Sequence, residues 1–387
     1  MELVADAFNA EGADVWVACR ARDDAVLQRA ERLLASGCKV IGIPADTKDY
    51  PQHAAMIARN NGIMKVFFSN FDSVVYDLGK SGATGVFEGL DVGGIWLRPE
   101  LKGKKPGPLE RAITKLVRTR AAKKRRRHAR AVANNQAGLR DFLPEERRIE
   151  RVRLFFTSAA AAKEVGGMLA PGETAVICDP WLSRSDVDRR EAREALGLSR
   201  DALILLHPGT SRREKGLADA CEAMRSLNKT STANMLLLRA GMVDREDRAA
   251  IQALEQRGAA VVMDRYLTDA ELDLCYAACD WVLLPYRGQK ESSGVLIHAA
   301  ANGRPVIASD HGWIGEATRE HGLGLLFPHC DIKALSGLLE RVAGGGSGGW
   351  SAEGMKRFAA ANSPEAFRKT LVNGWLISRA DDASNGK

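Results

Sequence analysis

The sequence predicts an α/β protein of two domains, each built around a parallel sheet. The chain has 387 residues, which is more than one ordinary domain holds and suits two. In both halves, short apolar runs of strand length alternate with longer runs of helical pattern, as expected where crossover helices join parallel strands. Polar loops rich in glycine, hydroxyl and basic residues follow two strands of the second half. Ligands bind at this end of the strands in open parallel sheets.

The first half alternates helix and strand from its first residues. A doubly wound domain ordinarily opens with a strand and a glycine-rich turn, whereas here a helix comes almost at once. The first domain, 1–182, is therefore expected to lack its first strand, either because the start lies upstream or because the domain is degenerate. We expect helices at 2–11, 23–36 and 51–60, and strands at 14–19, 39–43, 65–69, 153–158 and 174–178.

The second half follows the same alternation with clearer boundaries. Residues 183–200 are polar and charged, and we interpret them as the interdomain link. The glycine run at 344–349 indicates a flexible break. Residues 364–387 are predicted to begin with a helix that crosses back to the first domain and to end in a polar tail. The second domain is expected over 201–363, with strands near Leu203, Met235, Val261, Trp281 and Val306.

The first candidate ligand loop is Ser292-Ser293-Gly294, which lies between an apolar strand and an alanine-rich helix. The first N–H groups of a helix have no partner inside it, and the helix dipole favours an anion there. The serines add hydroxyl donors, and Gly294 lets a ligand approach the backbone closely. The alternative is an ordinary helix start with serine as the capping residue.

The second candidate loop follows the strand that begins near Leu203. It contains Gly209-Thr210-Ser211, then Arg212 and Arg213, then Lys215-Gly216, before a helix begins at Leu217. Two such loops in one domain suit a ligand with a diphosphate group. The alternative for the basic residues is a solvated surface loop.

These loops resemble the retaining nucleotide-sugar glycosyltransferases with the GT-B fold, the group 1 or family 4-like enzymes. The resemblance covers roughly residues 202–343. It departs from the family at Thr210, where the family has arginine, and at His298, where it has the second glutamate of a pair. A Ser-Ser-Gly-Val-Leu loop replaces the usual glycine loop, as in a divergent subgroup. The matching residues are Gly209, Lys215, Gly216, Ala299, Ala301, Gly303, Pro305, Val306, Gly312 and Glu316.

The resemblance implies two Rossmann-like domains that face each other across a cleft, and a hexosyltransferase-type activity (EC 2.4). A sugar would pass with retention from a nucleoside diphosphate to an acceptor hydroxyl, in cell-surface polysaccharide or glycolipid synthesis. Lys215 and Arg212 would stabilise the leaving phosphates, and no metal or other cofactor is expected. Asp72 is a further candidate cleft residue, although a turn or capping role explains it better. The implied donor-binding residues are Gly209, Thr210, Lys215, Glu291, Ser292, Ser293, Gly294, Val295 and His298.

Two other classes of function remain open. One is a sugar-nucleotide-binding or regulatory relative without catalytic power, which the altered glutamate pair and the missing first strand favour. The other is an epimerase or phosphorylase on the same two-domain fold, which would share the phosphate site.

Composition and targeting signals indicate a cytoplasmic enzyme. The start of the chain has no basic region followed by an apolar core, and no run of about eighteen apolar residues occurs. The seven cysteines have no metal or disulfide spacing.

The segment 98–130 is strongly basic. It is interpreted first as a solvated helix and second as a patch, centred on Lys123 to Arg127, that docks on an anionic inner membrane face. A lipid-linked acceptor would suit the second interpretation. Nucleic-acid binding ranks last, because no aromatic residues or base-reading motif accompany the patch.

Overall fold

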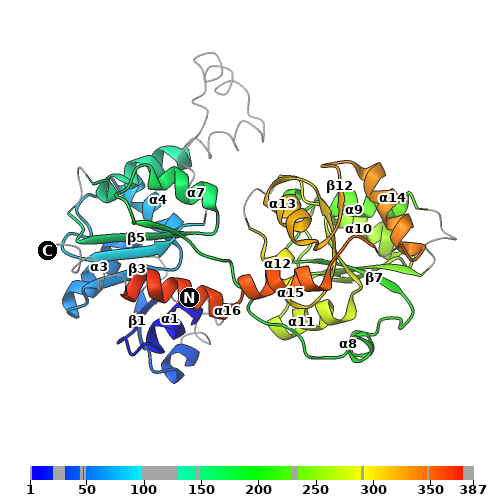
Figure 1. Ribbon diagram of the computed structural model, residues 1–387, viewed down its shortest axis with the longest axis horizontal. Coiled ribbons are helices and arrows are strands. Elements are labelled where there is room, and N and C mark those ends of the chain that lie inside the picture. The colour runs from blue at the N-terminus through cyan, green and yellow to red at the C-terminus, as the bar shows by residue number, and fades with distance from the viewer. Residues whose placement is uncertain are drawn as a thin grey trace, which may run out of the picture. The chain divides into compact units, whose positions relative to one another are not determined.

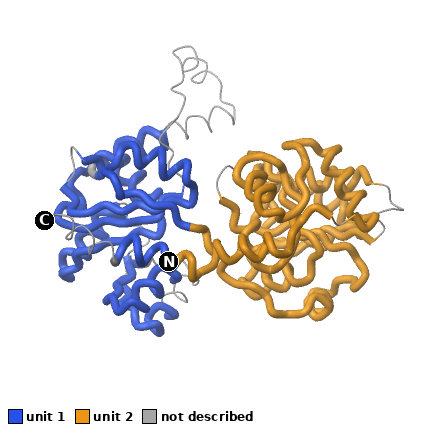
Figure 2. Tube along the Cα trace, in the orientation of Figure 1, with its two compact units in different colours: residues 1–177, 368–387 blue, residues 178–367 orange. Residues whose placement is uncertain are grey.

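The chain folds into two compact units, which Figure 2 shows in separate colours. The computed structural model describes residues 2–20, 31–43, 47, 49–97, 130–144, 148–227, 234–288, 292–346 and 348–377. Unit 1 comprises 1–177 together with 368–387, and unit 2 comprises 178–367.

Unit 2 is a doubly wound domain with a six-stranded parallel sheet in the order β12-β11-β10-β7-β8-β9. The order reverses between β10 and β7, so the loops after these two strands lie on either side of the switch point. One apolar cluster includes Ile204, Leu238 and Leu284, and a second includes Leu205, Leu237 and Leu283. Because neighbouring residues of a strand face opposite ways, the two clusters cover the two faces of the sheet. The strands are β7 (Leu203–Pro208), β8 (Met235–Ala240), β9 (Ala260–Met263), β10 (Trp281–Leu284), β11 (Val306–Ser309) and β12 (Gly324–Phe327).

The helices of unit 2 alternate with these strands, as Figure 1 shows. Helix α11 begins with a capping box in which Thr268 and Glu271 satisfy each other's backbone N–H groups. The helices are α8 (Arg189–Ala195), α9 (Leu217–Arg225), α10 (Arg248–Glu255), α11 (Asp269–Ala278), α12 (Gly294–Ala301), α13 (Gly312–His321), α14 (Ile332–Ala343) and α15 (Ala352–Ala361).

Unit 1 contains two separate parallel sheets, one with the order β1-β2 and one with the order β3-β4-β5-β6. A helix precedes the first strand of the part of the chain that the structure describes, as the sequence predicts. The strands are β1 (Trp16–Arg20), β2 (Lys39–Ile43), β3 (Lys65–Phe68), β4 (Asp91–Ile95), β5 (Arg151–Phe156) and β6 (Thr174–Val176). The helices include α1 (Glu2–Asn9), α3 (Tyr50–Asn60), α4 (Phe71–Ser81) and α7 (Ala159–Gly166).

The end of the described chain packs on the sheets of unit 1. Helix α16 (Pro364–Val372) begins in unit 2, and residues from 368 onward belong to unit 1. The turn that follows, Asn373–Ile377, places the Trp375 ring 5.7 Å from the Phe67 ring, and Arg151 donates hydrogen bonds to the Trp375 and Gly374 carbonyls.

The interdomain link that the sequence places at 183–200 is part of unit 2 instead. Helix α8 forms the middle of it, and Arg193 of this helix is buried. Its guanidinium donates to the Ala278 carbonyl and to the Asp280 carboxylate, which fixes the segment to the sheet. A charged sequence is typical of a linker, but here Arg189 and Arg193 pair with Asp280 of the same domain. The first unit ends at Ile177, whereas the sequence predicts that the first domain ends at residue 182.

Two predictions from the sequence concern the basic segment and membrane-spanning helices. The basic segment 98–130 lies outside the described residues except for its last position. Among the helices that the structure describes, none combines the length and apolar character needed to cross a membrane.

Candidate functional site

The two candidate loops meet at the switch point of the unit 2 sheet. A Cβ added at Gly216 would lie 1.9 Å from the Pro285 carbonyl oxygen, so the loop after β7 passes directly against the loop after β10. Gly216 also has a φ of +69°, which favours glycine. The Arg287 N–H donates to the Glu214 carbonyl at 2.8 Å, and the Arg287 guanidinium pairs with the buried Asp219 of α9. The predicted phosphate loops are therefore held against each other by the fold itself.

Arg239 holds the loops after β7 and β8 together. This role was not predicted from the sequence. This β8 residue is fully buried, and its guanidinium donates to four backbone carbonyls, those of His207, Gly209, Ala240 and Met242. Burial lowers its pKa to about 10, so the group stays cationic at neutral pH. In the sequence, Arg239 is a single charged residue in an apolar run. Only the folded structure shows the carbonyls that surround it.

His207 fixes the backbone of Lys215. Its Nε2 lies 3.1 Å from the Lys215 carbonyl oxygen, and because a carbonyl only accepts, Nε2 carries the proton. The ring is buried, and burial, helped by the positive charge of Arg239, lowers the pKa of His207 to about 3. His207 is therefore neutral across the physiological range and acts as a fixed donor.

The depressed pKa of His207 makes stability depend on pH. The folded-state pKa lies below the ordinary value of 6.5, so the unfolded chain takes up the proton first as the pH falls. This contribution to stability is present above pH 6.5 and is lost towards pH 3, with about 2 kcal/mol lost between pH 7 and pH 5. We expect urea denaturation of His207→Gln to show a free energy of unfolding less sensitive to pH by that amount. Equal pH dependence in both proteins would contradict the assignment.

Lys215 and the start of α12 share one aromatic residue, Tyr286. The Lys215 Nζ lies 3.9 Å from the centre of the Tyr286 ring, a cation–π distance. The Tyr286 hydroxyl and the Ser293 Oγ are both buried and lie close enough to interact with each other, but neither makes a hydrogen bond of good geometry within the described residues. Buried hydroxyls ordinarily find partners, so these two mark a place where a polar ligand group would be favourable.

The start of α12 lacks the side-chain cap that the alternative interpretation of its serines requires. Ser293 occupies the N-cap position, but its side chain makes no capping hydrogen bond. Ser292 donates instead to the Asp179 carboxylate at 3.2 Å, and burial raises the pKa of that carboxyl. The φ of Gly294 is not positive, so its backbone conformation is open to other residues as well. A Cβ at Gly294 would have no neighbour within 4 Å among the described residues, so they leave the space beside it open.

His298 ties α12 to the beginning of unit 2. Its Nε2 accepts a hydrogen bond from the Leu182 N–H at 3.3 Å, and its ring stacks on Tyr276 at 6.0 Å between ring centres. Burial lowers its pKa, which favours the neutral ring that accepts this bond. The donor-binding role stays a prediction, and the structure gives His298 a second, structural role.

The remaining candidates are placed as follows. Gly209 and Arg212 are exposed, Thr210 is half-buried, and Val295 lies in the first turn of α12. Glu291 lies outside the described residues. Asp72 belongs to unit 1, where it accepts a hydrogen bond from the Leu97 N–H at 3.0 Å, so it secures the chain after β4. No group of three potential metal ligands occurs among the residues described.

Comparison with known proteins matches the segment that forms this site to a family model. Residues 188–345 match the family model described as glycosyl transferases group 1. This segment of unit 2 is similar to that family. The matched segment contains both loops, Arg239 and the whole of α12.

A curated relative supports the assignment over part of its length. The chain is 31% identical over 199 residues to D-inositol 3-phosphate glycosyltransferase from Jonesia denitrificans. The match covers 49% of this chain and 45% of the relative, so the chain spans about half the length of the curated relative that it matches.

Solved structures show that the whole chain has the GT-B fold of two Rossmann-like domains. Sucrose-phosphate synthase from Thermosynechococcus elongatus aligns with a TM-score of 0.65 at 18% identity, over 98% of this chain and 92% of its own. HepE from Anabaena, solved with UDP, aligns with a TM-score of 0.66 at 12% identity, over 96% and 94%. WaaG, a glycosyltransferase of lipopolysaccharide biosynthesis, aligns with a TM-score of 0.61 at 14% identity, over 96% and 93%.

Proposed function

We propose that the protein transfers a sugar, with retention, from a nucleoside diphosphate sugar to an acceptor hydroxyl. One observation carries this proposal. At the switch point, Lys215 lies on the ring of Tyr286, and the hydroxyl of Tyr286 interacts with the buried Ser293 hydroxyl, which makes no capping bond at the start of α12. A cation, two hydroxyls and the N–H groups of a helix start suit the two phosphates of such a donor.

The bonds that break and form determine which protein groups the reaction needs. The bond between the sugar's anomeric carbon and the phosphate oxygen breaks, and a bond to the acceptor oxygen forms. The acceptor proton passes to the leaving phosphate, so the chain does not need a strong base of its own. Negative charge grows on the phosphate, where Lys215, the Ser293 hydroxyl and the first N–H groups of α12 would stabilise it, with Arg212 as a further cation. Preorganised donors of this kind are worth about 3 kcal/mol each.

The acceptor is proposed to be a saccharide or a lipid-linked saccharide of the cell surface. The support is indirect: WaaG, which shares the fold, acts in lipopolysaccharide biosynthesis by its title. The basic run Lys123 to Arg127, which lies outside the described residues, would bring the enzyme to an anionic membrane.

Replacing Lys123 to Arg127 by glutamine is expected to release the protein from anionic vesicles. Each lysine or arginine near such a surface contributes about 1 kcal/mol, and salt should act like the substitution because it screens exposed charges. Vesicle sedimentation measures the effect, with neutral vesicles as the control. Equal binding of the parent chain to neutral and anionic vesicles would rule out the docking role.

Incubation with a panel of nucleotide sugars, with and without a lipid-extract acceptor, tests the proposed activity. Release of nucleoside diphosphate that depends on the acceptor supports transfer. Isomerisation of the donor without an acceptor would instead support the epimerase alternative, and cleavage that requires added inorganic phosphate would support the phosphorylase alternative.

A sugar-nucleotide-binding or regulatory relative without catalytic power is the second candidate. Two observations favour it: Thr210 and His298 depart from the family pattern, and His298 is engaged with the Leu182 N–H. Nucleotide binding without turnover of any donor in the panel would support this candidate.

A further inference from the structure

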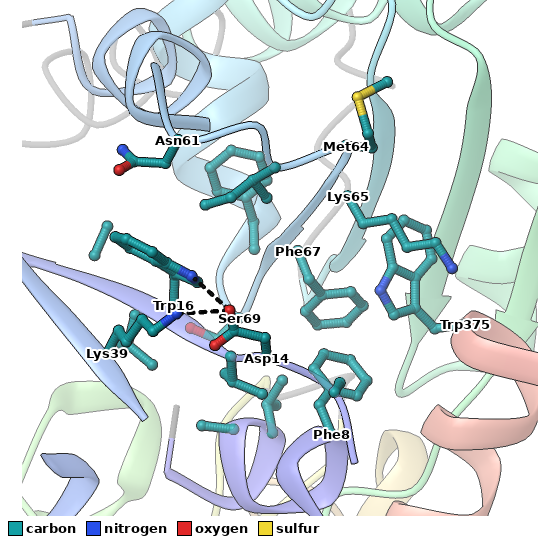
Figure 3. Close-up of a pocket in the computed structure, with 18 of the residues that line it drawn as sticks. Phe8, Asp14, Trp16, Lys39, Asn61, Met64, Lys65, Phe67, Ser69 and Trp375 are labelled. Atoms are coloured by element: carbon teal, nitrogen blue, oxygen red, sulfur yellow. Dashed lines mark hydrogen bonds and ion pairs between the residues drawn. The ribbon is translucent and has the colours of Figure 1, made fainter. Parts of the chain in front are cut away.

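A cavity of about 1210 Å³ lies in unit 1 between its two sheets. Figure 3 shows Phe67 of β3 and Trp16 of β1 on its walls, together with Phe8 of α1 and Trp375. Small-molecule pockets usually measure about 300–1,000 Å³, so this cavity is large for a metabolite. None of the donor-loop residues of unit 2 lines it.

Two strands each face this cavity with an edge that pairs with no other described strand. Within the described part of unit 1, β1 pairs only with β2, and β3 pairs only with β4, in parallel in both cases. Residues 16–18 of β1 and the β3 residues Lys65, Phe67 and Phe68 line the cavity. All of β4 is buried, whereas three of the four β3 residues are only half-buried. Backbone groups along such edges lack the ladder partners that a sheet normally supplies.

The order of the strands identifies what is missing. The two sheets, read across the cavity, run β2-β1, then the gap, then β3-β4-β5-β6. A doubly wound sheet has the order 3-2-1-4-5-6, in which the first strand of the chain lies between the second and the fourth. The gap falls at the place of that first strand. A strand there would join both sheets into one, whereas two strands by themselves make a marginal sheet.

Helix α1 has the position of a crossover helix whose first strand is absent. It leads directly into β1, and a strand before it would complete a βαβ unit with β1. Val4 and Ala5, in the first turns of α1, already line the cavity. A chain that entered α1 from the cavity would therefore need only a short turn.

Aromatic side chains cover both faces of the gap. Phe67 contacts Phe8 at 5.4 Å and Trp375 at 5.7 Å between ring centres. Its neighbour Phe68, which points to the opposite face, contacts Tyr50 at 6.1 Å. A parallel strand buried on both faces consists of apolar, mainly β-branched residues.

We propose that this gap is the seat of one apolar, parallel β-strand that precedes Met1 in the same polypeptide. The strand would pair with β1 on one side and β3 on the other. Its connection to α1 would lie at the carboxyl ends of these strands, beside Ser69 and Asn70, at the edge where open sheets bind ligands. The proposal rests on unit 1 alone and does not depend on the donor site of unit 2.

The test adds a strand to the chain and measures hydrogen exchange. One variant carries about five valine and isoleucine residues and a turn of about four glycine and serine residues before Met1. A matched control has prolines at two of the strand positions, because proline cannot donate to a ladder. Amide exchange by mass spectrometry follows β1 and β3, with β5, which has partners on both sides, as the internal reference.

The strand extension is expected to slow exchange of the β1 and β3 amides on the order of tenfold relative to the proline control, and to leave β5 unchanged. Equal exchange in both extended proteins would overturn the proposal. So would β1 and β3 amides that already exchange as slowly as β5 in the unextended chain. A free peptide with the sequence of the added strand that slows amide exchange of β1 and β3 as much as the extension does would also overturn the proposal, and so would the same effect of UDP alone. Either result would make the gap a site for a separate ligand.

Discussion

Replacing Lys215 by methionine is expected to weaken nucleoside diphosphate binding roughly ten- to hundredfold. Methionine keeps the length of the side chain and its packing on Tyr286 but removes the charge. A charge-assisted hydrogen bond is worth about 1.5–3 kcal/mol, and each 1.4 kcal/mol is a tenfold change in affinity. Turnover of a donor sugar should fall by about a hundredfold as well, since the charge on the leaving phosphate loses its cation.

Arg213→Met is the matched control for this change. Arg213 is exposed and lies in the same helical turn, Arg213–Lys215, two residues before Lys215. Its loss removes an equal charge from the loop, so it measures the general effect of charge on anion binding. Calorimetric titration of several nucleoside diphosphates compares the variants. Equal losses in both would make Lys215 an ordinary surface lysine.

Replacing Gly294 by valine is expected to abolish donor binding and leave the fold intact. A Cβ at this position meets no atom of the described chain within 4 Å, and the backbone is not in the left-handed region, so the fold accepts a side chain there. A bound diphosphate would fill that open space at the helix start, and the valine side chain would exclude it. The melting temperature should therefore stay close to that of the parent while nucleotide affinity disappears.

Gly337→Val controls for the cost of a valine in a helix. Gly337 lies in α14, is exposed, and also has no atom within 4 Å of its added Cβ. This variant should keep full nucleotide affinity. Unchanged affinity in Gly294→Val would remove the start of α12 from the binding site.

Ser293→Ala separates the two interpretations of the α12 start. An N-cap serine contributes about 1 kcal/mol of stability, yet Ser293 makes no capping bond. We therefore expect a small loss of nucleotide affinity and little change in melting temperature. A lower melting temperature with unchanged affinity would show that the serine only supports the helix.

The sequence allowed the loops to be predicted because local chemistry marks them. Glycine and hydroxyl residues in the loops that follow apolar strands indicate the ends of β7 and β10, and the alanine-rich run with Gly303 behind it indicates α12. These signals lie within about ten residues of each other. The alternation of strands and helices indicates the fold class for the same reason.

Contacts between distant segments could not be predicted in this way. The close approach of Gly216 to Pro285, the four carbonyls around Arg239 and the position of Tyr286 between Lys215 and Ser293 all join separate strands. Each of these residues is unremarkable in its own stretch of sequence. The charged segment 183–200 was misread as a link for a related reason, because the partners of Arg193 lie about 85 residues further along the chain.

The most direct measurement compares the affinity of the protein for a nucleoside diphosphate with its affinity for the corresponding nucleoside. If Lys215, Ser293 and the start of α12 bind the phosphates, the diphosphate should bind at least about tenfold more tightly, since one charge-assisted contact alone provides that difference. Lys215→Met should remove most of this preference, and Arg213→Met should keep it. Equal affinity for diphosphate and nucleoside in the parent chain would contradict a donor site at the switch point of unit 2.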